Sequence, residues 1–142
     1  MKTEKWVNHA LPFLLVSMVG IVLWLNSERQ DESILVISCE DMVAGCVAQV
    51  GVRSVSLGTD VTIKPLKPFQ VWVKAPGAKK VEARFTMAGM DMGFNIYTLR
   101  ADSQGVFRTS ATLPVCVTGR RDWAMTLEID GTRLAVPFVT DL

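Results

Sequence analysis

The sequence predicts an all-β fold, and three observations lead to that prediction. From Ile34 onward, short runs of alternating apolar and polar residues follow one another, with turn residues between them. No stretch of this part shows a sustained helical period. A segment of about 110 residues with roughly seven such strands fits an immunoglobulin-like β-sandwich.

The clearest strands lie near the C-terminus. Every second residue from 123 to 129 is large and apolar: Trp123, Met125, Leu127 and Ile129. Asp130-Gly131 then supplies a tight hairpin turn, and residues 134–138 continue the buried phase on the return strand.

The remaining strands are predicted from similar runs, broken by prolines, glycines and Asp102. These runs are Val47 to Leu57, Phe69 to Ala75, Lys80 to Met87, Phe94 to Arg100 and Val106 to Leu113.

The N-terminal part predicts a membrane anchor. Residues 6–25 carry no formal charge, and a helix of that length measures about 30 Å, the thickness of a bilayer core. Residues 1–5 precede this transmembrane signal anchor, and the polar residues 26–33 read as a linker to the folded domain, residues 34–142. The alternative is a cleaved secretory signal, but residues 24–29 lack the small-x-small cleavage pattern.

Charges near the span predict its orientation. Lys2 and Lys5 precede it and Trp6 and Trp24 flank it, which favours a cytoplasmic N-terminus. In a bacterium, residues 34–142 would then lie in the periplasm, tethered to the inner-membrane lipid bilayer. The formal net charge of +1, without a basic block, gives no reason to expect a nucleic-acid partner.

A cluster of methionines raises the question of copper. Met87, Met90 and Met92 lie within six positions, and thioethers are soft ligands suited to Cu(I). Strand phase predicts that Met87 continues the inward face of its strand. Gly89 and Gly93 bracket the other two, which are the better ligand candidates. The competing interpretation is that this turn only packs against the domain.

Two thioethers are too few for a useful Cu(I) site. Met87, Cys116 and Met42 are the candidates for a third soft ligand. The single histidine, His9, lies in the predicted span, so the exported domain has neither a mixed His/Met site nor the common histidine-dependent catalytic groups. We therefore expect a protein that is not an enzyme.

Three cysteines allow at most one internal disulfide. Cys39 and Cys46 are close enough in sequence for a bridge that clips a short loop, while a bridge from either one to Cys116 is the alternative. A redox-active or metal-binding pair is a further interpretation, but the spacing does not match the Cys-x2-Cys redox motif.

A series of motifs runs through the second half of the chain. They are Met-x-Gly-Met-Asp-Met-Gly at 87–93, Gly-Val-Phe at 105–107, Leu-Pro at 113–114, Gly-Arg-x-Asp-Trp at 119–123 and Asp-Gly at 130–131. In these motifs the segment resembles the FixH-like and YtkA-like periplasmic domains, with Met87, Met90 and Met92 matching their methionine-rich turn. Unlike them, this domain lacks a histidine and has three cysteines.

That resemblance implies an immunoglobulin-like sandwich and, for the FixH branch, a membrane-anchored role in supplying copper to a haem-copper oxidase or in assembling it. The sequence thus predicts a Cu(I)-handling protein with Met90 and Met92 as ligands, helped by Met87 or Cys116. The alternative is a metal-free accessory subunit of a respiratory or other inner-membrane complex. A thiol-redox partner using Cys39 and Cys46 is the third hypothesis.

Overall fold

The computed structural model describes residues 16–22, 34–87, 90 and 95–140. The chain divides into two compact units, Met1–Glu32 and Ser33–Leu142. Residues 16–22 are helical, whereas residues 6–15 and 23–25 of the predicted span lie outside the described residues. In the part of the chain that is described, no helix is both long enough and apolar enough to cross a bilayer.

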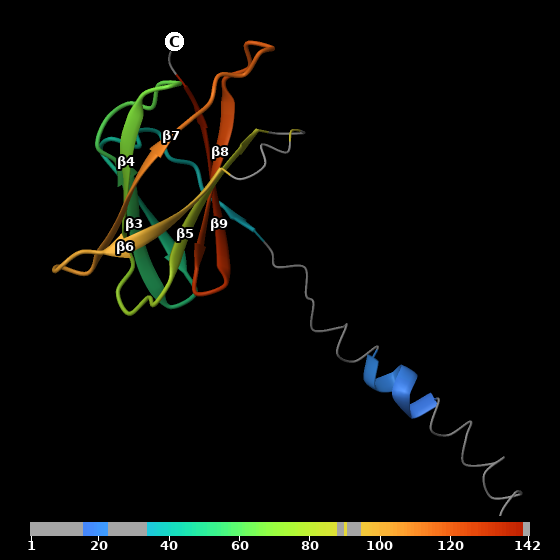
Figure 1. Cartoon of the computed structure of the whole chain (residues 1–142). Coiled ribbons are helices and arrows are strands. Elements are labelled where there is room, and N and C mark those ends of the chain that lie inside the picture. The colour runs from blue at the N-terminus through green and yellow to red at the C-terminus, as the bar shows by residue number, and fades with distance from the viewer. Residues whose placement is uncertain (1–15, 23–33, 88–89, 91–94, 141–142) are drawn as a thin grey trace, which may run out of the picture. The chain divides into compact units, whose positions relative to one another are not determined.

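The second unit consists of nine strands in one curled sheet (Figure 1). In chain order these are β1 (Leu35–Val36), β2 (Cys46–Val50), β3 (Arg53–Thr59), β4 (Pro68–Lys74), β5 (Val81–Met87), β6 (Ile96–Ala101), β7 (Val106–Thr112), β8 (Asp122–Ile129) and β9 (Thr132–Val139). Across the sheet they follow the order β1-β9-β8-β5-β6-β7-β4-β3-β2. The all-β prediction is confirmed.

The strand count differs from the prediction at two places: β1, which pairs in parallel with β9, is an additional strand, and one predicted run is divided into two strands. The predicted run Val47 to Leu57 is a hairpin, in which β2 and β3 pair from Cys46↔Leu57 to Val50↔Arg53. Gly51 adopts a φ of 62° at the turn, a conformation that glycine takes without steric cost. Val50 and Val52 on either side of Gly51 are apolar, so the sequence pattern did not indicate a turn here.

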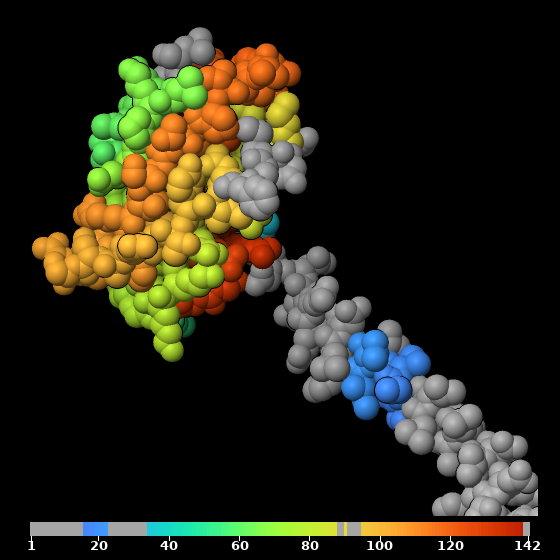
Figure 2. Space-filling view, in the orientation of Figure 1, coloured from blue at the N-terminus to red at the C-terminus, as the bar shows by residue number. Residues whose placement is uncertain are grey.

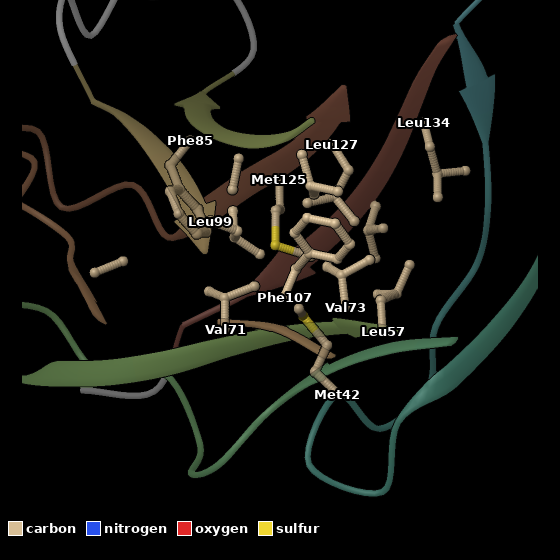
Figure 3. Close-up of a cluster of buried hydrophobic side chains, with 14 of the residues drawn as sticks. Met42, Leu57, Val71, Val73, Phe85, Leu99, Phe107, Met125, Leu127 and Leu134 are labelled. Atoms are coloured by element: carbon tan, nitrogen blue, oxygen red, sulfur yellow. The ribbon is translucent and has the colours of Figure 1, made fainter. Parts of the chain in front are cut away.

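The curl of the sheet closes around a buried core. Strand β6 marks the bend, because it pairs with β5 through Ile96–Leu99 and with β7 through Arg100 and Ala101. The ring of Phe85 on β5 then meets the ring of Phe69 on β4 edge to face at 5.7 Å, although these strands are not neighbours in the sheet. Figure 3 shows side chains from both halves filling this interior.

Alternation explains which side chains reach that interior. In β8 the residues Trp123, Met125, Leu127 and Ile129 are all buried, as predicted, and Leu134 and Val136 continue the buried face on β9. The buried hydrophobic core as a whole comes from residues between Met42 and Val136. We therefore expect residues 33–142 to fold without the N-terminal unit.

The Asp130-Gly131 turn between β8 and β9 is present, as predicted. Both residues have positive φ, 49° and 91°, which is the type I′ pattern that matches strand twist. The Asp130 carboxylate also accepts hydrogen bonds from the backbone N–H groups of Lys79 and Lys80, both at 2.9 Å. Its second oxygen pairs with Arg53 at 2.9 Å. Asp130 thus ties three loops together at one end of the sheet.

These contacts of the Asp130 carboxylate, called here the Asp130 clamp, predict that the stability of the fold depends on pH. Arg53 and, after it, the N–H groups of Lys80 and Lys79 lower the pKa of Asp130 to about 2, from a reference value of 3.8. Because the folded pKa lies below the unfolded one, the stabilisation is complete above about pH 4 and is lost as the pH falls towards about 2. Asp130→Asn should unfold in less urea than the wild type at neutral pH, and the difference should shrink across that acid range.

Glu40→Gln is the matched control for this experiment, because Glu40 is an exposed carboxylate. It should unfold at nearly the wild-type urea concentration at neutral pH. A constant difference between Asp130→Asn and the wild type from neutral pH to about pH 2 would contradict the clamp.

Candidate metal site

Met87 and Met90 sit where β5 leaves the core. Met87 is the last residue of β5, pairs with Trp123 of β8 and is only 3% exposed, so its inward phase is confirmed. The N–H of Met90 donates to the carbonyl oxygen of Met87 at 3.1 Å. Met90 is half-buried and packs against the core, whereas Met92 lies outside the described residues.

The two described methionines differ in what they can bind. The burial of Met87 makes its thioether part of the hydrophobic core beside Trp123. Met90 forms only an isolated bridge with Met87 and retains an accessible portion. A metal ion arriving from solvent would therefore meet Met90 before Met87.

Cys116 lies in the loop between β7 and β8, which enters β8 at the end where β5 finishes (Figure 1). It is a half-buried free thiol, packed against the core. Its Sγ lies 3.0 Å from the hydroxyl oxygen of Thr118. This contact is the main cause of a lowered pKa at Cys116, with smaller contributions from backbone N–H groups and the positive charge of Arg120. A lowered pKa increases the thiolate fraction, and thiolate is the metal-binding form.

Cys39 and Cys46 form the predicted disulfide, with their Cα atoms 5.8 Å apart. The loop that it closes is also fixed by contacts of its own. The carboxylate of Asp41 accepts the N–H groups of Val43 and Ala44 at 2.8 and 3.2 Å. The carbonyl of Met42 accepts the N–H of Thr59 at 2.8 Å. On the chain-entropy estimate, a bridge of this span stabilises by about 2.5 kcal/mol.

The ring of Trp72 explains why positions 45 and 58, near this disulfide, are glycine. A Cβ on Gly58 would come within 2.6 Å of both the Met42 carbonyl oxygen and the Trp72 ring, and one on Gly45 within 2.9 Å of the same ring. The indole therefore occupies the space that side chains at these positions would need. Met42 turns its side chain into the core (Figure 3) and is 9% exposed, which removes it from the accessible ligand candidates.

In the described ranges, no group of three or more His, Cys, Asp or Glu side chains could hold a metal ion. The soft candidates that share one end of the domain are Met87, Met90 and Cys116. The sequence analysis did not predict that the Thr118 hydroxyl contacts the Cys116 thiol and lowers its pKa. The signal for this contact was a hydroxyl two residues after a cysteine in a loop, because Thr side chains often bond to near neighbours in the chain.

Comparison with known proteins returned no match. No protein family, no curated protein and no solved structure is similar enough to this chain to be matched to it.

Proposed function

We propose that this protein is a membrane-anchored periplasmic Cu(I)-handling or haem-copper oxidase assembly protein that binds Cu(I) through Met90 and Met92. The observation that supports the proposal is the position of Met90, which is bridged to the buried Met87 at the end of β5 and is itself only half-buried. A thioether held at the rim of a core can bind a soft ion while its stem stays packed.

The third ligand is Cys116 rather than Met87. The lowered pKa of Cys116 favours the thiolate, which binds Cu(I) more strongly than a thioether does. Met87 is fully packed in the core, so its coordination would require the end of β5 to open. With His9 outside the domain, a site of this kind has sulfur ligands only, and sulfur ligands favour Cu(I) over Cu(II).

The same proposal includes the type of β fold and the membrane anchor. The curled sheet is an immunoglobulin-like sandwich, and residues 6–25 are its transmembrane anchor, as in the FixH-like and YtkA-like domains that the sequence resembles. Tethering raises the effective concentration of the copper-loaded domain near a membrane-bound acceptor. No chemical reaction is needed, because Cu(I) is cargo that passes from one set of sulfur ligands to another.

A competition titration tests the proposal. Residues 33–142 are titrated with Cu(I) in the presence of a chromophoric Cu(I) chelator, and one ion per domain should leave the chelator. Adding Mg²⁺ in excess should not displace the bound Cu(I), because sulfur ligands bind this hard ion weakly. A domain that removes no Cu(I) from the chelator would contradict the proposed function.

The alternative is a metal-free accessory subunit of a respiratory or other inner-membrane complex. The exposed side chains of Leu66, Val115 and Val117 favour some form of docking. Co-purification of the full chain with a membrane complex, in the absence of copper, would support this alternative.

A further inference from the structure

Two neighbouring loops expose aliphatic side chains at one end of the domain. Leu66, in the loop between β3 and β4, is 68% exposed, and Val117, in the loop between β7 and β8, is 99% exposed. The N–H of Leu66 donates to the carbonyl oxygen of Leu113 at 2.9 Å, which holds the two loops side by side. Figure 2 shows the orange β7–β8 loop projecting beyond the strands.

The backbone at Leu66 is unusual for such a residue. Its φ of 60° is in the left-handed region, which a bulky side chain rarely adopts. Pro65 precedes it and the N–H of Lys67 donates to the carbonyl of Lys64, the pattern of a type II turn whose third position favours glycine or asparagine. Leu66 therefore has a strained backbone conformation, and its apolar side chain is exposed and adds little to the core.

Basic residues occur in the same two loops as these exposed side chains. Residues 61–67 and 113–121 contain Lys64, Lys67, Arg120 and Arg121 and no acidic residue. Two acidic residues flank these loops: Asp122 forms an ion pair with Arg120, which offsets one of the four positive charges, and the Asp60 carboxylate accepts the N–H of Gln70 at 2.7 Å. The two loops therefore combine protruding aliphatic groups with positive charge.

We propose that these loops dock on an anionic lipid bilayer, with Leu66, Val115 and Val117 entering the headgroup region and the basic residues contacting lipid phosphates. Protein interfaces depend mainly on Trp, Tyr and Arg anchors, while Leu and Val are under-represented, and these loops contain no aromatic residue. Projecting aliphatic tips beside Lys and Arg instead fit a lipid interface. The uncharged segment 6–25 already indicates a chain that meets a membrane.

This docking needs neither bound copper nor the N-terminal anchor, so copper-free residues 33–142 can test it alone; Val115 and Val117 flank Cys116 in the same loop. The wild-type domain should co-sediment with phosphatidylcholine vesicles that contain about a third phosphatidylglycerol, and much less with phosphatidylcholine alone. Val117→Asp should lower the partition coefficient at least about fivefold. Val52→Asp is the matched control, because Val52 is a fully exposed valine at the turn between β2 and β3 and should leave binding unchanged.

Leu66→Asn separates docking from folding, because asparagine tolerates a positive φ. This variant should keep or raise the melting temperature while binding the anionic vesicles more weakly. If the wild-type domain stays in solution with both vesicle types, or if Val52→Asp weakens binding as much as Val117→Asp, lipid docking is overturned. Lack of vesicle binding would instead point to a protein as the occupant of these loops.

Discussion

Replacing Phe85 with alanine should destabilise the domain by about 3 to 5 kcal/mol, the range for large aromatic side chains in cores. Phe85 is fully buried, and its ring meets those of Phe69, Tyr97 and Phe138 edge to face, at centroid distances of 5.7, 6.0 and 6.3 Å. Alanine would remove contacts to strands in both halves of the curled sheet. Since domains of this size are stable by about 5 to 15 kcal/mol, urea unfolding should show a large fall in midpoint.

Phe85→Leu is the control for this change, because it keeps most of the apolar volume but removes the ring contacts. Its cost should be about 1.5 kcal/mol, well below that of alanine. If Phe85→Ala lowered the free energy of unfolding by less than about 1 kcal/mol, the contacts of the Phe85 ring would not be an important link between the two halves of the sheet.

Removing both candidate thioethers should have the largest effect on metal binding. Met90→Leu/Met92→Leu keeps apolar volume, which matters because Met90 packs against the core, but it eliminates two sulfur ligands. The affinity for Cu(I) in the competition titration should fall about a hundredfold or more, which corresponds to roughly 2.8 kcal/mol. Cys116→Ser should also lower the affinity, because the two thioethers that it leaves in place are too few for a useful Cu(I) site.

Met125→Leu provides the matched control for this titration. Met125 is a fully buried methionine of β8, so its thioether is out of reach of solvent. The variant should bind Cu(I) with wild-type affinity. An equal loss of affinity in Met125→Leu and in the double variant would indicate that the substitutions act through folding rather than through lost ligands.

The parts of the fold that sequence could predict depend on local patterns. The alternation from Trp123 to Ile129 and the Asp130-Gly131 turn describe one hairpin whose residues are adjacent in the chain. The inward phase of Met87 followed in the same way from counting along its strand. These predictions needed no knowledge of which strands pair with which.

The parts that sequence could not predict depend on distant contacts. The partnership of Arg53 with Asp130 joins residues 77 positions apart, and no local pattern marks it. The strained turn at Leu66 is visible only from its backbone φ, although Pro65 indicated a turn. At the candidate metal site, Cys116 shares one end of the domain with Met87 and Met90 because β5 and β8 are paired, which is a property of sheet topology.

Methyl NMR of the methionines would test the proposed Cu(I) site most directly. Residues 33–142 contain five methionines, Met42, Met87, Met90, Met92 and Met125, and each ε-methyl group labelled with ¹³C gives its own signal. One equivalent of Cu(I) should shift the signals of Met90 and Met92 and leave those of the buried Met42 and Met125 in place. If the signals of Met90 and Met92 do not move, copper is not bound there and the central claim is wrong.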